Sequence, residues 1–421
     1  MDDILVEDII SDLPPIIIEH ILVSMPLRDA VRTSILSKKW RYKWVTIPNL
    51  KFDDQCIPTH SNAELLVKTE KFVNFVHRSL LLHSGPIHRF EVSVSWLRSC
   101  CDVNQWILFL SRNDIREFIL NLDFYHEWFT VPSCLFSFQK LNILELHCCT
   151  LIPPPTFKGF HSLKNLQLES VVCGNETVRD FISSCPLLEE LVLANVEGLD
   201  FLQIQAPNLK FLHVDGGFQE IVIQDTPLLR NAVFVFQISD EIADFLDKSG
   251  TCNLTKTLNG LVGLESLKIE IMQFFSYGDI PDRLPTTYND MRNLELSCSF
   301  EDEYDISCAL CLIRSSPNLR RLRVEDYSDK KAAMQASGLD FWERESYSGC
   351  FMSQLQFVSM GHLLGAPHEL QFIKFILSNS PALKTMTITP HPQNDRREDM
   401  LIQLLQLERA STQAKIMYVK E

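Results

Sequence analysis

Residues 208–214, NLKFLHV, contain the pattern that decides the fold of this 421-residue chain. Apolar side chains stand at positions 1, 4 and 6 of the pattern, here Leu209, Leu212 and Val214. The same spacing starts again, with a weaker first copy, at Ile115, Leu141, Leu163, Leu188, Leu229, Leu264, Met291, Leu319, Leu355 and Leu383. Positions 4 and 6 lie on one face of a short strand, because side chains alternate along a strand. One such unit is too small to bury its own apolar face, so the units are expected to stack on one another.

A proline stands just ahead of several of these patterns, at Pro186, Pro207, Pro227, Pro317 and Pro381. Proline neither extends a helix nor donates to a strand ladder, so it marks the corner between a helix and the next strand. Helix-like runs precede three of these prolines, at residues 178–182, 308–313 and 370–377. This alternation resembles leucine-rich repeats with uneven spacing, roughly 20 to 36 residues against a usual 20 to 29. The alternative is an ordinary α/β domain with leucine-rich strands.

Three stretches interrupt the repeats, at residues 236–259, 272–287 and 328–350. The first contains a helix-like segment, IADFLDKSG, and the third is polar. The second predicts a long loop, in which glycine and proline accompany Phe274, Phe275 and Tyr277. Loops at the edge of a repeat array often bind partners, so these aromatic side chains are candidate interface anchors. Covering the core is the alternative, and the sequence favours neither.

Residues 12–44, DLPPIIIEHILVSMPLRDAVRTSILSKKWRYKW, predict three short helices. Pro26 ends the first helix. Trp40 and Trp44 are four residues apart and are expected to share one face of the third. A segment of about 40 residues buries too little surface to be stable alone. Its apolar side chains therefore either cap the rest of the chain, and are buried, or remain exposed for another protein.

Short motifs inside this segment resemble an F-box, namely Leu13-Pro14, Ile21-Leu22, Met25-Pro26-Leu27, Val31-Arg32-Thr33-Ser34 and Leu36-Ser37-Lys38-Lys39-Trp40-Arg41 followed by Trp44. The resemblance implies docking on a Skp-type adaptor, and through it association with a cullin and a RING protein. The adaptor-binding residues that it implies are Leu13, Pro14, Ile17, Ile21, Leu22, Pro26, Leu27, Val31, Leu36 and Trp40.

The segment from Cys350 onward contains a strand, an amphipathic helix, a second strand and a last helix over residues 398–409. It resembles the FBD domain that follows leucine-rich repeats in a large family of plant F-box proteins. The resemblance implies an α/β fold with a three-helix F-box at residues 1–50. It also implies an irregular leucine-rich-repeat solenoid at residues 51–349 and an FBD-type cap at residues 350–421.

The charge and cysteine content indicate which kinds of partner and which cell compartment to expect. A formal net charge of −15 argues against a general nucleic-acid partner, which needs a basic face. No run approaches the roughly 20 apolar residues of a membrane helix, and no secretory signal is visible. The 13 cysteines are odd in number and irregularly spaced, which favours free thiols in a reducing compartment. We therefore expect a protein of the nucleus and cytoplasm, with no membrane partner.

No catalytic or cofactor motif is recognisable, and no cofactor is expected. The single C-x-x-C, Cys308 to Cys311, lies in an apolar helical run and predicts core packing rather than a zinc site. His147-Cys148-Cys149 lies at a strand end, where neighbouring side chains point apart. The acidic run at residues 301–305 predicts a solvated loop.

The favoured hypothesis is a non-catalytic substrate-recognition subunit of an SCF-type cullin–RING ubiquitin ligase. In that role the F-box docks on the adaptor and the repeats bind a target protein of unknown identity. The alternative is a leucine-rich-repeat interaction scaffold that is not coupled to ubiquitin transfer.

Overall fold

The structure, a computed structural model, forms two compact units that are treated separately below. Unit 1 comprises residues 1–188 with 196–198, and unit 2 comprises residues 189–195 with 199–421. The residues described are 13–57, 65–97, 102–122, 128–249, 252–270, 272–275, 277–328, 341–342, 352–392, 394 and 397–419. No helix within these ranges is long and apolar enough to cross a membrane.

Unit 1 begins with helices that only partly match the expected three. The elements are α1 (Pro15–Val23), α2 (Leu27–Arg32), and the 3₁₀ turns η1 (Thr33–Ile35) and η2 (Lys43–Thr46). The prolines act as predicted, since Pro15 opens α1 and Pro26 stands just before α2. The predicted third α-helix is wrong. Bonds of the i to i+3 type form instead, from the Trp40 N–H to Ser37 and from the Lys43 N–H to Trp40, both at 3.2 Å. Such bonds close turns too tight for an α-helix.

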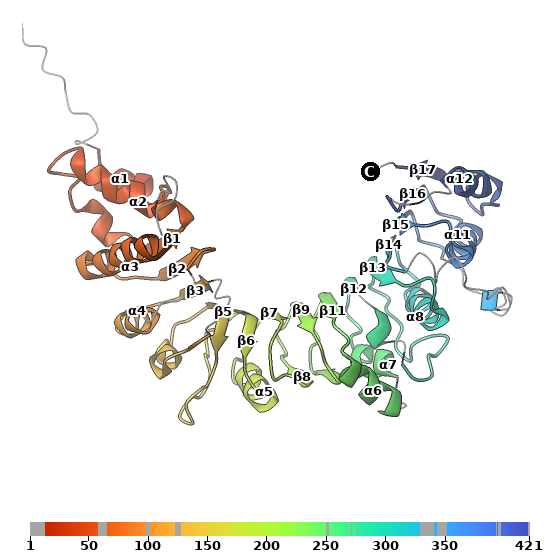
Figure 1. Ribbon diagram of the computed structural model, residues 1–421, viewed down its shortest axis with the longest axis horizontal. Coiled ribbons are helices and arrows are strands. Elements are labelled where there is room, and N and C mark those ends of the chain that lie inside the picture. Colours follow the sequence, from red (N-terminus) through yellow and green to blue (C-terminus); the bar gives the residue numbers. More distant parts are fainter. Residues whose placement is uncertain are drawn as a thin grey trace, which may run out of the picture. The chain divides into compact units, whose positions relative to one another are not determined.

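Parallel strands form the sheet of unit 1, and helices lie on one of its faces (Figure 1). The strands are β1 (Asn49–Asp53), β2 (Arg89–Val94), β3 (Glu117–Leu122), β5 (Ile143–Thr150) and β6 (Asn165–Val172), with β4 (Phe129–Thr130) beside the end of β5. The connecting elements are η3 (Asp54–Cys56), α3 (Leu65–Leu82), α4 (Val103–Leu110), η4 (Ser133–Ser137) and α5 (Asn175–Ser183).

Unit 2 is built in the same way, from parallel strands with helices on one face of the sheet (Figure 1). Its strands are β7 (Glu190–Ala194), β9 (Phe211–Gly216), β11 (Asn231–Phe236), β12 (Ser266–Glu270), β13 (Asn293–Cys298), β14 (Arg321–Asp326), β15 (Phe357–Leu363), β16 (Thr385–Pro390) and β17 (Lys415–Tyr418). Its helices are α6 (Asp240–Ser249), α7 (Asn253–Leu258), η5 (Met272–Phe274), α8 (Glu303–Arg314), α11 (Pro367–Asn379) and α12 (Arg397–Gln406).

The repeat pattern sets the register of both sheets. Position 4 of one repeat pairs with position 4 of the next, as Leu144 does with Leu166 in unit 1 and Leu294 with Leu322 in unit 2. The side chains at positions 1, 4 and 6 are buried in every repeat that the sequence predicts. The apolar side chains therefore form continuous layers between the sheet and its helices, as the spacing predicts.

Four further strands follow the same pattern but were not predicted from the sequence. In β1 and β2 the pattern starts at Ile47 and Ile87, and all its side chains are buried. The other two, β8 (Phe201–Gln205) and β10 (Glu220–Gln224), pair with each other in a separate two-stranded sheet. Each lies in the connection between two strands of the main sheet. A strand thus replaces the expected helix in these two connections.

The structure describes part of the three stretches that interrupt the repeats. The predicted helix in residues 236–259 is confirmed by α6, and α7 follows it. Phe274 and Phe275 are fully buried, so they cover the core and are not interface anchors. Residues 328–350 lie outside the described residues, apart from Ser328, Phe341 and Trp342.

The predicted solvated loop at residues 301–305 is wrong. Asp302 is the N-cap of α8, and its side chain accepts a hydrogen bond from the Tyr304 N–H. Asp305 is buried, and its Oδ2 accepts hydrogen bonds from the Ser299 N–H at 3.1 Å and the Tyr327 hydroxyl at 2.5 Å. Carboxylates at a helix N-terminus satisfy unpaired N–H groups, which explains why an acidic run starts a helix here.

A left-handed backbone conformation recurs at position 8 of the repeat, two residues after the last apolar position. The residues are Cys148, Ser170, Asn195, Asp225 and His362, with φ between 50° and 60°. This conformation turns the chain away from the regular ladder at the end of the strand.

Candidate docking surfaces

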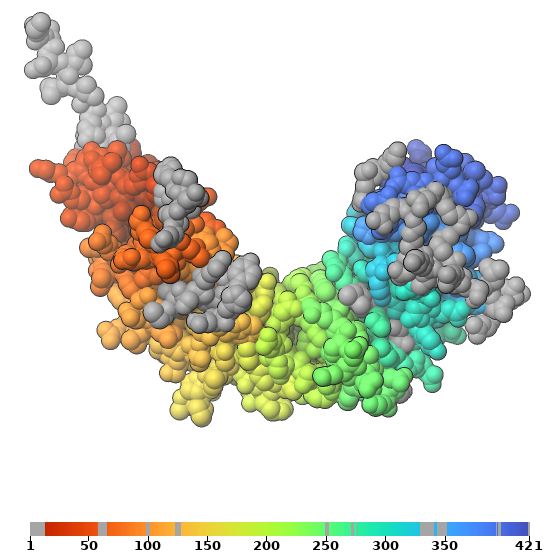
Figure 2. Space-filling view, viewed as in Figure 1, coloured from red at the N-terminus to blue at the C-terminus, as the bar shows by residue number. Residues whose placement is uncertain are grey.

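Seven large apolar side chains between residues 16 and 42 are exposed. The exposed side chains, here called the N-terminal apolar surface, are Ile16, Ile17, Val23, Met25, Ile35, Leu36 and Tyr42. Ile35 and Leu36 stand out, with 84% and 61% of their surface accessible. Contiguous exposed apolar surface marks interaction sites on folded proteins. In the space-filling view this segment (red) forms the outer surface at one end of unit 1 (Figure 2).

The ten residues that the F-box resemblance assigns to adaptor binding divide into three groups. Four are exposed, namely Pro14, Ile17, Pro26 and Leu36. Three are half-buried, namely Leu13, Ile21 and Val31. Three are buried in the chain's own core, namely Leu22, Leu27 and Trp40. This last group offers no surface to a partner, so these three side chains support the site from behind.

Five exposed residues were missing from that assignment, namely Ile16, Val23, Met25, Ile35 and Tyr42. Helical spacing identifies Ile18 and Leu22 as the inward face of α1, since both are buried. Helical spacing fails after residue 32, because the 3₁₀ turn changes the direction of each side chain. Ile35 therefore points outward while Trp40 and Trp44 point inward.

The N-terminal helices are held on the first repeat of unit 1. The Ser84 N–H donates to the carbonyl oxygen of Val45 at 2.9 Å, and a His83 ring nitrogen lies 2.9 Å from the carbonyl oxygen of Ile47. Arg28 Nη1 donates to the carbonyl oxygen of Gln55 at 3.4 Å. Since Val45 and Ile47 are also buried, the helices and the first repeat share one core.

A cavity of about 470 Å³ lies between these helices and the first two strands, with Met25 and Pro26 in its wall. An ion-pair network lines the opposite wall. Glu91 pairs with Lys51 at 2.8 Å and with Arg89 at 2.7 Å, and Arg89 also pairs with Glu117. Burial alone would raise the pKa of Glu91, but the hydrogen bonds from Lys51 and Arg89 outweigh it, so the pKa lies below its ordinary value.

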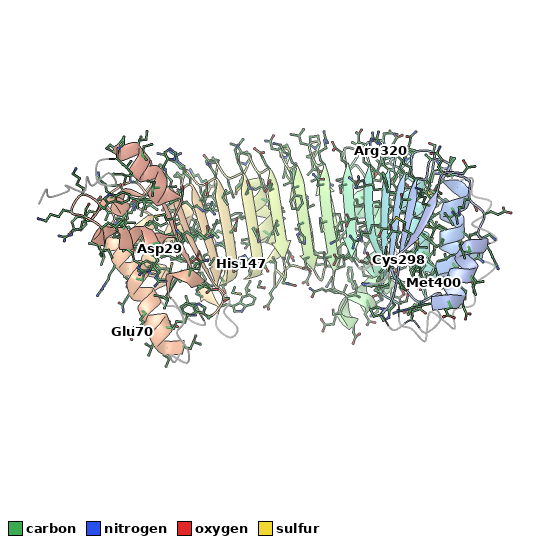
Figure 3. The ribbon with its side chains drawn as sticks, turned by 90° about the horizontal axis from the view of Figure 1, so that it is seen from above. Asp29, Glu70, His147, Cys298, Arg320 and Met400 are labelled. Carbon is green, nitrogen blue, oxygen red and sulfur yellow. The ribbon has the colours of Figure 1, made fainter. Side chains whose placement is uncertain are left out.

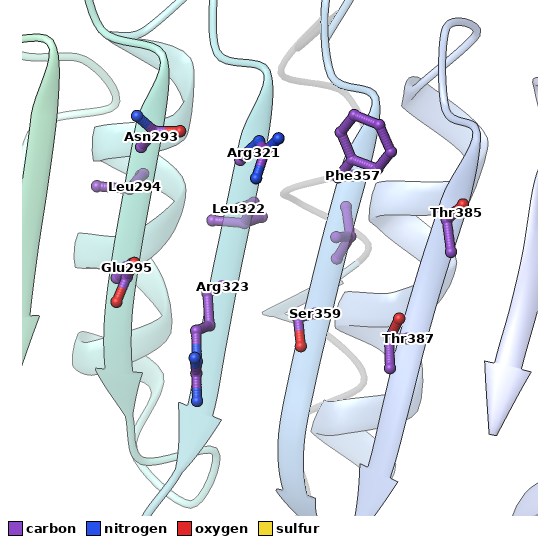
Figure 4. A pocket seen from close by; sticks show the side chains of 11 residues that line it. Asn293, Leu294, Glu295, Arg321, Leu322, Arg323, Phe357, Ser359, Thr385 and Thr387 are labelled. Atoms are coloured by element: carbon purple, nitrogen blue, oxygen red, sulfur yellow. The ribbon is translucent and has the colours of Figure 1, made fainter. Parts of the chain in front are cut away.

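Unit 2 has a second hollow on the sheet face opposite its helices (Figure 4). Its volume is about 330 Å³, and its wall is made by β13, β14, β15 and β16. Arg321 and Phe357 lie near the starts of their strands, while Arg323, Ser359 and Thr387 lie further along (Figure 4). The wall thus combines two arginines, hydroxyl groups and one aromatic ring with the carboxylate of Glu295 and the amide of Asn293.

A pair of carboxyl groups is buried behind this sheet. Glu369, in the first turn of α11, accepts hydrogen bonds from the N–H groups of Leu364, Gly365 and Ala366 at 2.7 to 3.0 Å. Burial is the main reason that the pKa of Glu369 lies well above its ordinary value, and the neighbouring Asp326 raises it further. The pair lies behind the sheet and holds the loop before α11, which is a structural role.

The two cysteines of the C-x-x-C motif have the environment of core residues. Cys308 and Cys311 are fully buried on α8, as predicted. Burial raises the pKa of Cys311 to about 12 and holds that of Cys308 well above its ordinary value, so neither forms a thiolate readily. Within the described ranges, no three histidine, cysteine or acidic side chains are grouped so as to hold a metal ion.

Comparison with known protein families finds matches for three segments of the chain. Residues 10–52 match the F-box domain, and residues 344–388 match the FBD domain. Residues 103–324 match the leucine-rich repeats described for the FBD-associated F-box protein At5g56370.

Relatives in Arabidopsis thaliana match over nearly the whole length. The F-box/FBD/LRR-repeat protein At1g13570 is 40% identical over 418 residues, which cover 98% of this chain and 99% of that protein. The F-box/FBD/LRR-repeat protein At5g56420 is 26% identical over 441 residues, with 98% and 99% covered. The FBD-associated F-box protein At4g10400 is 27% identical over 433 residues, with 97% and 99% covered.

The fold, the exposed N-terminal surface and these matches define an F-box protein with leucine-rich repeats. Such a combination supports a role in substrate recognition and is consistent with a non-catalytic subunit. The chain belongs to the F-box/FBD/LRR-repeat family.

Proposed function

We propose that this protein is the substrate-recognition subunit of an SCF-type cullin–RING ubiquitin ligase. The observation that carries the proposal is the N-terminal apolar surface, which lies on the segment that matches the F-box domain. A Skp-type adaptor covers this surface, and the adaptor connects the chain to the cullin and the RING protein. The repeats hold a target protein.

Two of the exposed side chains, Ile35 and Leu36, can contribute strongly to a contact. Full burial of a large aliphatic side chain contributes about 1.5–3 kcal/mol. Scaled by their exposed fractions of 84% and 61%, Ile35 and Leu36 together contribute roughly 2–4 kcal/mol when a partner covers them. That free energy corresponds to a change of roughly 30- to 1,000-fold in the dissociation constant. These two residues are therefore the expected centre of the interface.

The chain needs no catalytic group for this role. A tethered target meets the ubiquitin-loaded carrier protein at a raised effective concentration, and transfer becomes nearly intramolecular. The other subunits of the complex supply the chemistry. We extend the proposal to localisation, and expect the protein in the nucleus and the cytoplasm, where a fluorescent fusion can be followed.

Pull-down with a purified Skp-type adaptor tests the proposal. Ile35→Ser combined with Leu36→Ser is expected to abolish capture while the circular dichroism spectrum and melting temperature stay unchanged. The matched control is Leu81→Ser combined with Leu82→Ser, two adjacent leucines at the end of α3 with 78% and 54% of their surface exposed. Capture of the Ile35/Leu36 variant at the wild-type level would contradict the assigned interface.

The alternative is a scaffold whose N-terminal helices only cap the repeats. The hydrogen bonds between these helices and the first repeat are what a cap would form as well. Deleting residues 1–50 does not separate the two hypotheses, because β1 begins at Asn49 and shares its core with the helices. The surface substitutions do separate them, since a cap has no need of Ile35 or Leu36. A scaffold would fail to capture the adaptor even with the wild-type sequence.

A further inference from the structure

Basic side chains gather where β14, β16 and β17 begin, around an exposed phenylalanine on β15. This group, here called the basic patch, consists of Arg320, Arg321, Phe357, Lys384 and Lys415. We infer that the basic patch binds an acidic, extended segment of the target protein. The inference rests on the proposed function, because it names the chemistry of the target that the repeats hold.

Within the part of the chain that the structure describes, the cations of the patch have no acidic partner, in contrast to their neighbours. Among the described residues, none of the four forms an ion pair with a carboxylate. Further along the strands, Arg323 pairs with Glu325 at 2.8 Å, and Lys268 is likewise paired with Glu270. The chain as a whole carries a net charge of −15. An uncompensated basic group within so acidic a protein is complementary to an acidic partner.

Phe357 organises the centre of the patch. Its side chain is 40% exposed on the sheet face. The guanidinium of Arg321 lies 5.2 Å from the ring centroid, and Nζ of Lys384 lies 5.9 Å from it. Both distances are those of cation–π contacts, which hold the two cations beside the ring. The ring thus offers an apolar surface between two positive charges. The patch can therefore contact both the carboxylates of an acidic segment and the apolar stems of its side chains.

The strand register gives the patch its length. Arg321 pairs with Phe357, Phe357 with Thr385, and Thr385 with Lys415, so these residues form a row across four strands. Neighbouring strands are about 4.8 Å apart, and the row therefore spans roughly 14 Å. An extended peptide rises about 3.3 Å per residue and crosses such a row in roughly four to five residues. Figure 3 shows Arg320 at the same edge of the sheet, where the strands begin.

The hollow beside the row supplies polar partners for the backbone of such a peptide. Ser359, Thr385 and Thr387 line it with hydroxyl groups, and Asn293 adds an amide. These groups both donate and accept hydrogen bonds. An extended peptide, whose N–H and C=O groups point alternately sideways, requires both kinds of partner.

Acidic side chains limit the size of the occupant. Glu295 lies in the wall of the hollow, and Glu325 and Glu270 lie near the ends of their strands. A nucleic acid carries a phosphate at every nucleotide and needs a longer basic surface than one row of side chains. The geometry fits a short acidic segment of a protein and not a nucleic-acid strand.

Fluorescence anisotropy with the full-length protein tests the inference, at an ionic strength of about 0.15 M, where weak surface attraction is screened. The probes are a fluorescein-labelled peptide of glutamate, serine and glycine, the same peptide with lysine in place of glutamate, and a short single-stranded oligo-dT. The glutamate peptide is expected to bind, and the lysine peptide is not. Arg321→Glu combined with Lys384→Glu is expected to weaken binding about tenfold or more, and Phe357→Ala is expected to weaken it with the charge unchanged.

The matched control is Arg283→Glu combined with Lys374→Glu. Both are exposed cations of unit 2 outside the patch, and Lys374 lies on α11, behind the sheet. This variant has the same net charge as the patch variant and is expected to bind the glutamate peptide within about twofold of the wild type. Equal binding by the patch and control variants would overturn the inference, as would tighter binding of the oligo-dT.

Adaptor pull-down of the same variants keeps the two proposals separate. The patch variant is expected to capture the adaptor as well as the wild type does. Adaptor capture without any binding of the glutamate peptide would refute the basic patch alone. Peptide binding without adaptor capture would refute the ligase role and leave the patch as the recognition site of a scaffold.

Discussion

Replacing Glu369 by glutamine should change how the stability of unit 2 depends on pH. Glu369 is fully buried beside Asp326, and its pKa in the folded protein lies well above the ordinary value. A raised pKa means that the folded state holds a proton which the unfolded state releases more readily. The stabilising contribution is complete below the unfolded pKa of about 4.3 and is lost as the pH rises toward the folded value.

The size of the effect follows from proton linkage. Between the unfolded pKa and the folded pKa, the free energy of unfolding should fall by about 1.4 kcal/mol per pH unit because of this one group. Glutamine keeps the size of the side chain, and its carbonyl oxygen can replace Oε2 as the acceptor for the N–H groups of Gly365 and Ala366, while the Leu364 N–H loses its acceptor Oε1. That loss costs the variant the same amount of stability at every pH. It cannot titrate, so the Glu369→Gln variant should lose this slope.

Urea denaturation from pH 5 upward, monitored by tryptophan fluorescence and circular dichroism, measures the effect. The informative quantity is the difference between the wild type and the variant at each pH, because all other titrating groups are shared. The variant should gain stability relative to the wild type as the pH rises. Parallel pH profiles for the two proteins, or a relative loss of stability by the variant, would refute the assignment of the raised pKa to Glu369.

Two more predictions follow from the core. Trp44→Ala should destabilise unit 1 by about 3–5 kcal/mol and abolish adaptor capture, because Trp44 is buried in the N-terminal segment. Urea denaturation measures the loss of stability, and pull-down measures adaptor capture. A variant as stable as the wild type would show that the helices do not share the core of the first repeat. Cys308 and Cys311 should resist iodoacetamide at pH 8 in the folded protein and react in urea, since their pKa values are raised by burial. Labelling is read by mass spectrometry, and fast labelling of either thiol under native conditions would contradict their burial.

The sequence predicts the repeats well because each repeat depends on neighbours with the same pattern. Positions 4 and 6 point to one side of any short strand, so Leu294 and Leu296 could be placed before the structure was known. The first two repeats, with Phe52 and Ile87 at pattern positions, were missed, although the same residue types stand at Phe234 and Ile115 in repeats that the sequence predicts. The strands β8 and β10 were missed because their pattern falls where a helix normally returns.

The candidate docking surface was harder to predict. Ile35 and Trp40 are both apolar and lie close together in the sequence, yet one is exposed and the other buried. The tight turns after residue 32 set the direction of each side chain, and hydrogen bonds from the loop after α3 to Val45 and Pro48, distant in the sequence, hold the segment that follows. The prediction of a third α-helix is wrong for the same reason. Tight turns form at residues 37–43, and tertiary structure can override the helix that local spacing indicates.

The left-handed residue at position 8 marks where a repeat ends its strand in this chain. A side chain with a Cβ atom is strained in that conformation, whereas glycine adopts it freely and asparagine more easily than most. This chain already has Asn195 and Gly216 at two such positions, with φ of 50° and 153°. In relatives whose leucines have diverged beyond recognition, a periodic glycine or asparagine could therefore be used to align one repeat with the next.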